Sequence, residues 1–142
     1  MTFNPNENTV DFCLKRVREA ADASALDINK GITTSQDPKV KEVVSRLEVT
    51  NIPSDFVKFQ LPVVFDGPTT TYLSFGAPRT KVPEHSHDEG SGIRVILSGS
   101  IIYEGLELTA GDWMYIPKGV SYKFVVGDMG VGMFYCYECC CA

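Results

Sequence analysis

The sequence is poor in positive charge and in histidine, and it has no long apolar run. Its 142 residues carry 13 Lys and Arg against 18 Asp and Glu, which gives a formal net charge of −5 at pH 7. We expect no nucleic-acid partner, because phosphate binding requires a basic face. We also expect no contact with an anionic membrane, because the basic residues are scattered rather than grouped. A small molecule is the expected ligand.

No stretch approaches the about 20 consecutive apolar residues of a membrane-spanning helix. The first eight residues are polar and lack the basic-then-apolar layout of a secretion signal, so we expect a cytoplasmic protein. Five cysteines are present, and four of them crowd the end of the chain, at positions 136, 139, 140 and 141. This spacing is not a disulfide framework. We expect a disordered end, with soft-metal binding or redox chemistry as the alternative.

The first third of the chain has helical periodicity. From Thr9 onward, apolar residues recur at spacings of three and four, with charged residues between them. A second helix is predicted over residues 38–48, with Pro38 in its first turn, and residues 22–37 are predicted to form a loop. We therefore expect a helical extension over residues 1–52 that packs on the remainder of the chain.

After Pro53 the pattern changes to short runs of β-branched and aromatic residues separated by Gly, Pro, Asp and Ser. This pattern is typical of an antiparallel sandwich or barrel, here expected over residues 53–142. The predicted strands are 56–60, 62–65, 70–75, 93–98, 100–104, 113–116, 121–126 and 131–137.

The only two histidines, His85 and His87, are two residues apart. Side chains at this spacing share one face of a strand, so both rings could meet one cation through nitrogen contacts of about 2 Å. The alternative is a pair of half-exposed histidines beside the acidic residues Glu84, Asp88 and Glu89. The pair is therefore a candidate metal site.

The residues around the histidines extend this pattern and resemble the two-part signature of the cupin superfamily over residues 70–137. The matching elements are His85-x-His87, the run ending at Gly99, Gly111-Asp112, and Pro117-Lys118-Gly119. The resemblance implies a mainly β fold, a cupin-type double-stranded β-helix (jelly-roll) barrel, here with one or two N-terminal helices. It also implies a homodimer, which is common among small cupins.

The metal ligands that the resemblance implies are only half present. His85 and His87 match, but the position of the family's glutamate falls at Gly92 and that of its second-motif histidine falls at Tyr122. The leading glycine of the first motif is replaced by Arg79. The implied cofactor is a divalent first-row metal, Fe, Mn, Ni or Zn, held by the two histidines and completed by other groups.

Three residues could complete such a site. Tyr122 could be a third ligand or an acid–base group, or alternatively a core aromatic residue whose hydroxyl faces the cavity. Glu104, on a neighbouring predicted strand, and Glu89, in a turn-like stretch, are possible carboxylate ligands. Water or substrate would fill the remaining positions.

Arg94 is the second candidate for ligand binding. It lies two residues after Gly92, so strand alternation places it on the same inward face. An inward arginine is costly unless it is paired, and its planar fork suits a substrate carboxylate. The alternatives are an ion pair with Glu104 or Asp112, or an edge position in solvent.

Together these patterns predict a small cupin that binds a divalent metal and a small anionic organic molecule. Its chemistry could be that of an oxygenase, an isomerase or a lyase, with Tyr122 and Arg94 as catalytic groups and His85, His87 and Tyr122 as metal ligands. The alternatives are a non-catalytic ligand-binding cupin and a structural dimeric cupin, so the sequence leaves open whether the protein is an enzyme.

Overall fold

The computed structural model describes residues 4–138. The chain forms two compact units, each built from two separate stretches. The helical unit comprises residues up to Asp27 together with Asp37–Val64, and the barrel unit comprises Ile28–Gln36 together with the chain from Phe65 onward. The sequence predicts two consecutive parts, residues 1–52 and residues 53–142. This domain boundary stays a prediction.

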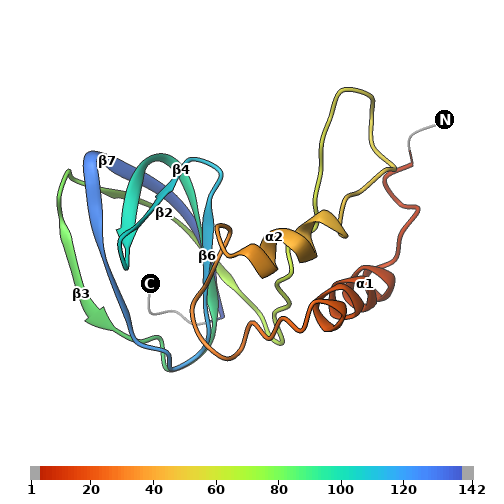
Figure 1. Cartoon of the computed structure of the whole chain (residues 1–142), viewed down its shortest axis with the longest axis horizontal. Helices are drawn as coiled ribbons and strands as arrows, with labels where there is room; N and C mark the ends of the chain where they lie inside the picture. The colour runs from red at the N-terminus through yellow and green to blue at the C-terminus, as the bar shows by residue number, and fades with distance from the viewer. Residues whose placement is uncertain (1–3, 139–142) are drawn as a thin grey trace. The chain divides into compact units, whose positions relative to one another are not determined.

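The helical unit contains α1 (Val10–Ala23) and α2 (Pro38–Ser45), so both predicted helices are present (Figure 1). Thr9 caps α1 by accepting a bond from a backbone N–H of the first turn, and Asp37 caps α2 in the same way. The helix predicted to extend to residue 48 ends at Ser45. The core of this unit consists of Val17, Ala20, Val43 and Leu47. No helix within residues 4–138 has the length and apolar character needed to cross a membrane.

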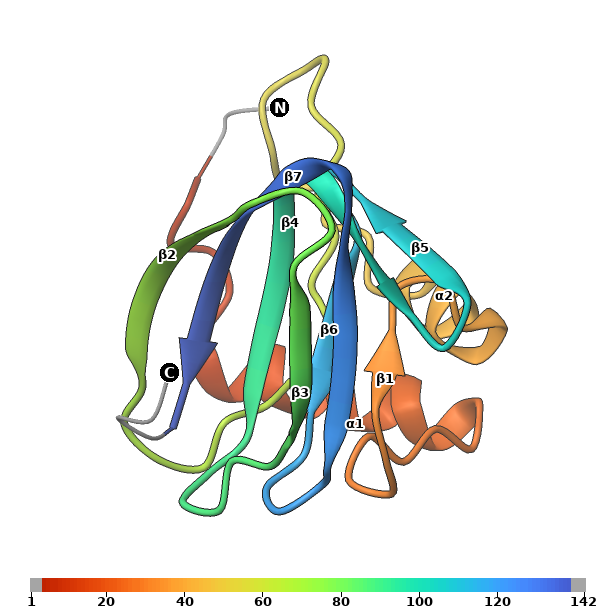
Figure 2. The same cartoon turned by 90° about the vertical axis from the view of Figure 1, so that its left-hand side faces the viewer.

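The barrel unit is a seven-stranded sheet whose paired strands are all antiparallel. Strands follow the order β1-β6-β4-β7-β2, with β3 paired to β7 and β5 paired to β4. Figure 2 shows the long strands β4 and β7 side by side, with β2 and β3 along β7. The strands are β1 (Thr33–Thr34), β2 (Thr70–Gly76), β3 (Lys81–His85), β4 (Gly92–Tyr103), β5 (Leu106–Thr109), β6 (Trp113–Ile116) and β7 (Tyr122–Tyr137).

β4 and β7 each combine two strands that the sequence predicts as separate. β4 runs through the predicted break at Gly99, and β7 runs through Gly127 and Gly130. Gly99 has a φ of +65°, and a Cβ added there would overlap the backbone carbonyl oxygen of Gly130. The register of β4 against β7 shifts on both sides of Gly99, so the glycine bends a continuous strand instead of ending it.

Other strand predictions were wrong. Residues 56–60 and 62–65 form no strand, and only an isolated bridge joins Glu48 to Phe59. β5 was missed, although it follows a hairpin turn in which Glu104 and Gly105 both have positive φ. β1 lies inside the segment predicted as a loop. A strand of two residues is too short to show an alternating pattern, and only its pairing with β6 defines it.

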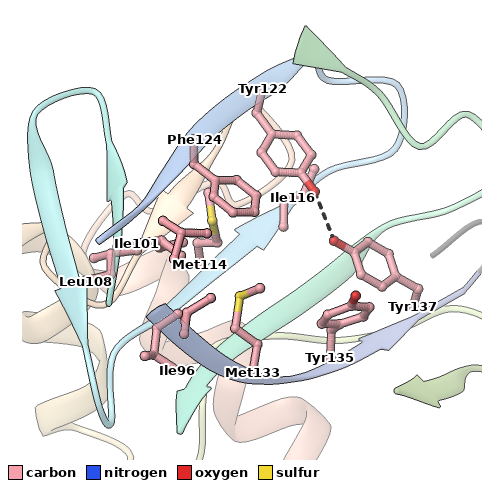
Figure 3. Close-up of a cluster of buried hydrophobic side chains, with 12 residues drawn as sticks. Ile96, Ile101, Leu108, Met114, Ile116, Tyr122, Phe124, Met133, Tyr135 and Tyr137 are labelled. Carbon is pink, nitrogen blue, oxygen red and sulfur yellow. Dashed lines mark hydrogen bonds between the residues drawn. The ribbon is translucent and has the colours of Figure 1, made fainter. Parts of the chain in front are cut away.

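The barrel core is apolar along most of its length. Figure 3 shows side chains from β4, β5, β6 and β7 gathered between the strands, with the hydroxyls of Tyr122 and Tyr137 directed toward each other. The buried members are Ile96, Ile101, Leu108, Met114, Ile116, Tyr122, Phe124, Val126, Val131, Met133, Tyr135 and Tyr137. The tyrosines give the core a polar region within an otherwise apolar interior.

Candidate functional site

The two histidines lie where β3 ends. His85 is the last residue of β3 and pairs with Tyr122, the first residue of β7. His87 lies two residues beyond the end of the strand and is only 4% exposed. The alternation of side chains along a strand, from which a common face was predicted, therefore holds for His85 but does not extend to His87. The two imidazole rings are nevertheless close, with centroids 5.2 Å apart, and the His85 ring lies 4.6 Å from that of Tyr122. The structure thus brings together the three predicted ligands.

The hydroxyl of Tyr122 is the centre of a buried hydrogen-bond network. Its oxygen lies 3.1 Å from Nε2 of His87, 3.1 Å from Nε of Arg94 and 3.3 Å from the hydroxyl of Tyr137. Arginine can only donate, so the Tyr122 oxygen accepts the bond from Arg94. Tyr122 itself is 2% exposed. One phenol therefore connects His87, Arg94 and Tyr137.

Arg94 lies in the middle of aromatic rings. It projects from β4, is 5% exposed, and its guanidinium carbon is 4.2 Å from the ring centroid of Tyr135. The rings of Phe124, Tyr137 and Tyr122 are 5.5, 5.6 and 5.9 Å away. These distances fit cation–π contacts. Arg94 is therefore inward, as predicted.

Within residues 4–138 no carboxylate forms an ion pair with Arg94. The two partners considered from the sequence are placed elsewhere. Glu104 lies in the hairpin turn between β4 and β5, and the carboxylate of Asp112 accepts bonds from Ser35, Gln36 and Thr109. The structural ion pair considered for Arg94 is thus not formed in the described part of the chain.

The protonation states of the network follow from burial and charge. Burial acts to lower the pKa of Arg94, but its interactions with Tyr137 and Tyr122 outweigh that effect and raise the pKa above its ordinary value. Burial also raises the pKa of Tyr137, against the opposing influence of Arg94. Arg94 is therefore charged and Tyr137 neutral at physiological pH, which gives the network a fixed positive charge.

Tyr137 was not predicted as a site residue. Gly92, at the position of the cupin glutamate, is paired with Tyr137 across β4 and β7. A Cβ added at Gly92 would overlap the ring of Tyr137, so this ring fills the space that a side chain there would need. Gly92 and Tyr137 become neighbours through the pairing of β4 with β7, which lie far apart in the sequence. No local sequence pattern indicates this contact.

The donor set falls short of a first-row metal centre. Within the described residues, no three His, Cys, Asp or Glu side chains are grouped to hold a metal. Glu89 is exposed, and Cys139, Cys140 and Cys141 lie outside the described residues. A metal bound by Tyr122 at about 2 Å would lie at most about 5 Å from Nε of Arg94. At an effective dielectric constant of 20, a dication and a guanidinium at that distance repel by about 7 kcal/mol.

No protein-family model matches the sequence, and no curated protein matches it. Solved structures do match. A chain in the complex of Rhodobacter sphaeroides SigE with the anti-sigma ChrR is 19% identical over 51% of this chain and 40% of that one, with a TM-score of 0.46. A Ralstonia eutropha protein of unknown function with a cupin-like fold is 23% identical over 48% and 45%, with a TM-score of 0.44. A Bacteroides fragilis cupin is 27% identical over 54% and 67%, with a TM-score of 0.41.

This chain thus spans less than half the length of the first two of these proteins. The likeness concerns the fold alone. Other matching structures are also named as a cupin and as a double-stranded β-helix protein. The predicted mainly β fold is confirmed by the described strands of the barrel unit.

Proposed function

We propose that this protein binds a small organic anion inside its cupin barrel, with Arg94 holding the anionic group. The observation that carries the proposal is a buried guanidinium with no carboxylate partner within residues 4–138. Burying a charge costs several kcal/mol, and each of the four cation–π contacts returns roughly 0.5–2 kcal/mol but supplies no negative charge. An anion supplied by a ligand would compensate the charge.

The groups around Arg94 suit a carboxylate attached to an apolar or aromatic body. Nε of Arg94 donates to Tyr122, and the guanidinium also bonds to the hydroxyl of Tyr137, which together fix its plane. A carboxylate would bind to its terminal N–H groups. The neutral phenol of Tyr137 can donate to a carboxylate oxygen. The rings of Tyr135 and Phe124 offer apolar surface beside the charge.

Thermal unfolding with added benzoate tests this proposal, because a ligand that binds only the folded state raises the melting temperature. We expect benzoate to raise it in wild-type protein and benzamide, its neutral counterpart, to have little effect. Arg94→Met should abolish the shift. Arg18→Met, which removes an exposed arginine of α1, is the control and should retain it. Equal shifts in both variants would reject the role of Arg94.

Metal binding by His85, His87 and Tyr122 is a second candidate function, and one observation favours it. Nδ1 of His85 lies 2.8 Å from the carbonyl oxygen of Pro83, the kind of bond that orients metal-binding imidazoles. A bound Fe, Mn, Ni or Zn ion would share Tyr122 with Arg94. Elemental analysis of wild-type protein beside His85→Ala tests metal binding, and equal metal content in the two proteins would reject it.

Catalysis by Tyr122 and Arg94 stays a prediction, as does the cytoplasmic location.

We also propose that the protein forms a homodimer through the outer face of β2, β4 and β7. Leu73, Phe75, Leu97 and Phe134 are exposed there, and Leu73 pairs directly with Phe134. Phe75 is 78% exposed. The solvent-facing side of an antiparallel sheet is normally polar, so an apolar face of this kind is expected to be covered. A second copy of the chain, which offers the same apolar face, is the proposed occupant.

A further inference from the structure

The residues predicted to hold a metal share one atom with Arg94. The oxygen of Tyr122 is 3.1 Å from Nε2 of His87 and 3.1 Å from Nε of Arg94. A metal held by His87 and Tyr122 would therefore share its phenol ligand with a guanidinium that is already charged. Like charges at this separation inside a protein repel strongly.

The described part of the site also lacks the negative charge that a dication needs. Two positions that supply ligands in the resembling family are here Gly92 and Tyr122. The space beside Gly92 is filled by the ring of Tyr137, so no carboxylate side chain fits at that position. A dication bound here would raise the charge of the network without a carboxylate among the described residues to balance it.

We infer that Arg94 is the resident cation of this barrel and takes the electrostatic role of a metal ion, so that an anion is bound without metal. This inference rests on the proposed anion binding and adds how the anion is held. The guanidinium and a divalent metal are alternatives at one site. Neutralising Arg94 should accordingly admit a metal at His85, His87 and Tyr122.

Titration with Zn²⁺ alone tests the inference independently of any anion. Arg94→Met removes the charge, whereas Arg94→Lys keeps it and is the matched control. We expect Arg94→Met to bind Zn²⁺ at least tenfold more tightly than wild type, and Arg94→Lys to remain within about threefold of wild type. Adding His85→Ala to Arg94→Met should abolish the gain. Zn²⁺ binding of equal strength by wild type and Arg94→Met would overturn the inference.

Folding of the variants is checked by circular dichroism and thermal unfolding. If Arg94→Met does not fold, Arg94→Gln replaces it, because glutamine is neutral and can still hydrogen-bond to Tyr122. The same Zn²⁺ comparison with wild type and Arg94→Lys then decides the result.

A second experiment measures benzoate binding by wild-type protein before and after treatment with EDTA. We expect affinities within twofold of each other, since the anion is held by a side chain. Loss of binding after EDTA, restored by Zn²⁺, would overturn the inference while leaving anion binding intact. Absence of benzoate binding in both samples would instead reject benzoate as a ligand, and the Zn²⁺ comparison would then decide the inference by itself.

Discussion

Nε of Arg94 lies 3.1 Å from the hydroxyl oxygen of Tyr122, and both side chains are buried. The bond fixes the guanidinium between the rings of Tyr135 and Phe124. It also joins the charge to His87 and Tyr137 through one oxygen atom. The cationic centre of the barrel is therefore preorganised by a phenol, and removing that phenol should affect both stability and ligand binding.

Tyr122→Phe should destabilise the protein by about 1–3 kcal/mol, because it leaves buried polar groups of Arg94, His87 and Tyr137 without this partner. The free energy of unfolding in urea measures the loss. Tyr72→Phe is the control, because the Tyr72 hydroxyl bonds to Thr70 at an exposed position, and a change below about 1 kcal/mol is expected. Equal losses in the two variants would contradict a special role for the Tyr122 network.

Gly92→Ala should destabilise the barrel by about 1–3 kcal/mol, because the added Cβ overlaps the ring of Tyr137. Gly31→Ala is the matched control, since nothing lies within 4 Å of a Cβ added there. Combining Gly92→Ala with Tyr137→Ala should show strong coupling in a double-mutant cycle of unfolding free energies. If Gly92→Ala had the same free energy of unfolding as wild type, the Tyr137 ring could not lie beside Gly92.

Asp112 should make the stability depend on pH. Burial alone would raise the pKa of this carboxyl, but bonds from Thr109, Ser35 and Gln36 outweigh it and lower the pKa below its ordinary value. A lowered folded-state pKa stabilises the protein above the unfolded value of about 3.9, and this contribution is lost as pH falls through the folded pKa. Asp112→Asn should therefore be less stable than wild type at pH 7.

Urea unfolding at pH 7, 4 and 2.5 checks this prediction. The difference between wild type and Asp112→Asn should shrink as the pH falls, because protonation removes the same advantage from wild type. Asp128→Asn, at an exposed carboxylate 3.9 Å from Arg79, is the control and should change little at any pH. A constant difference across the three pH values would mean that the charge of Asp112 is not what stabilises the fold.

Phe75→Ser should weaken the proposed homodimer, because it removes the most exposed side chain of the apolar face. Light scattering over a range of protein concentrations should show a dimer for wild type and a larger monomer fraction for the variant. Phe56→Ser alters an aromatic side chain of the helical unit that is 70% exposed and should leave the dimer unchanged. A monomeric wild-type protein would exclude the proposed interface.

Local sequence patterns were sufficient for part of the site. Short spacings identified His85 and His87, and the positions of the cupin signature led to Tyr122 and Arg94. Tyr137 could not be found in this way, because its place beside Gly92 depends on the pairing of β4 with β7.

Long-range pairing also explains the errors in the fold. β1 is a strand only because its two residues pair with β6, and the apolar run at 56–60 finds no partner strand apart from one isolated bridge. The continuous strands β4 and β7 were predicted as fragments because glycines that end many strands here bend them instead. Periodicity predicted the two helices well, since their signals are local.

The central claim, that Arg94 binds an organic anion, is tested most directly by isothermal titration of benzoate into metal-free wild-type protein and metal-free Arg94→Met. We expect measurable binding by wild type and an affinity at least tenfold lower for the variant, because the charge that attracts the carboxylate is gone. Equal affinities for the two proteins would contradict it.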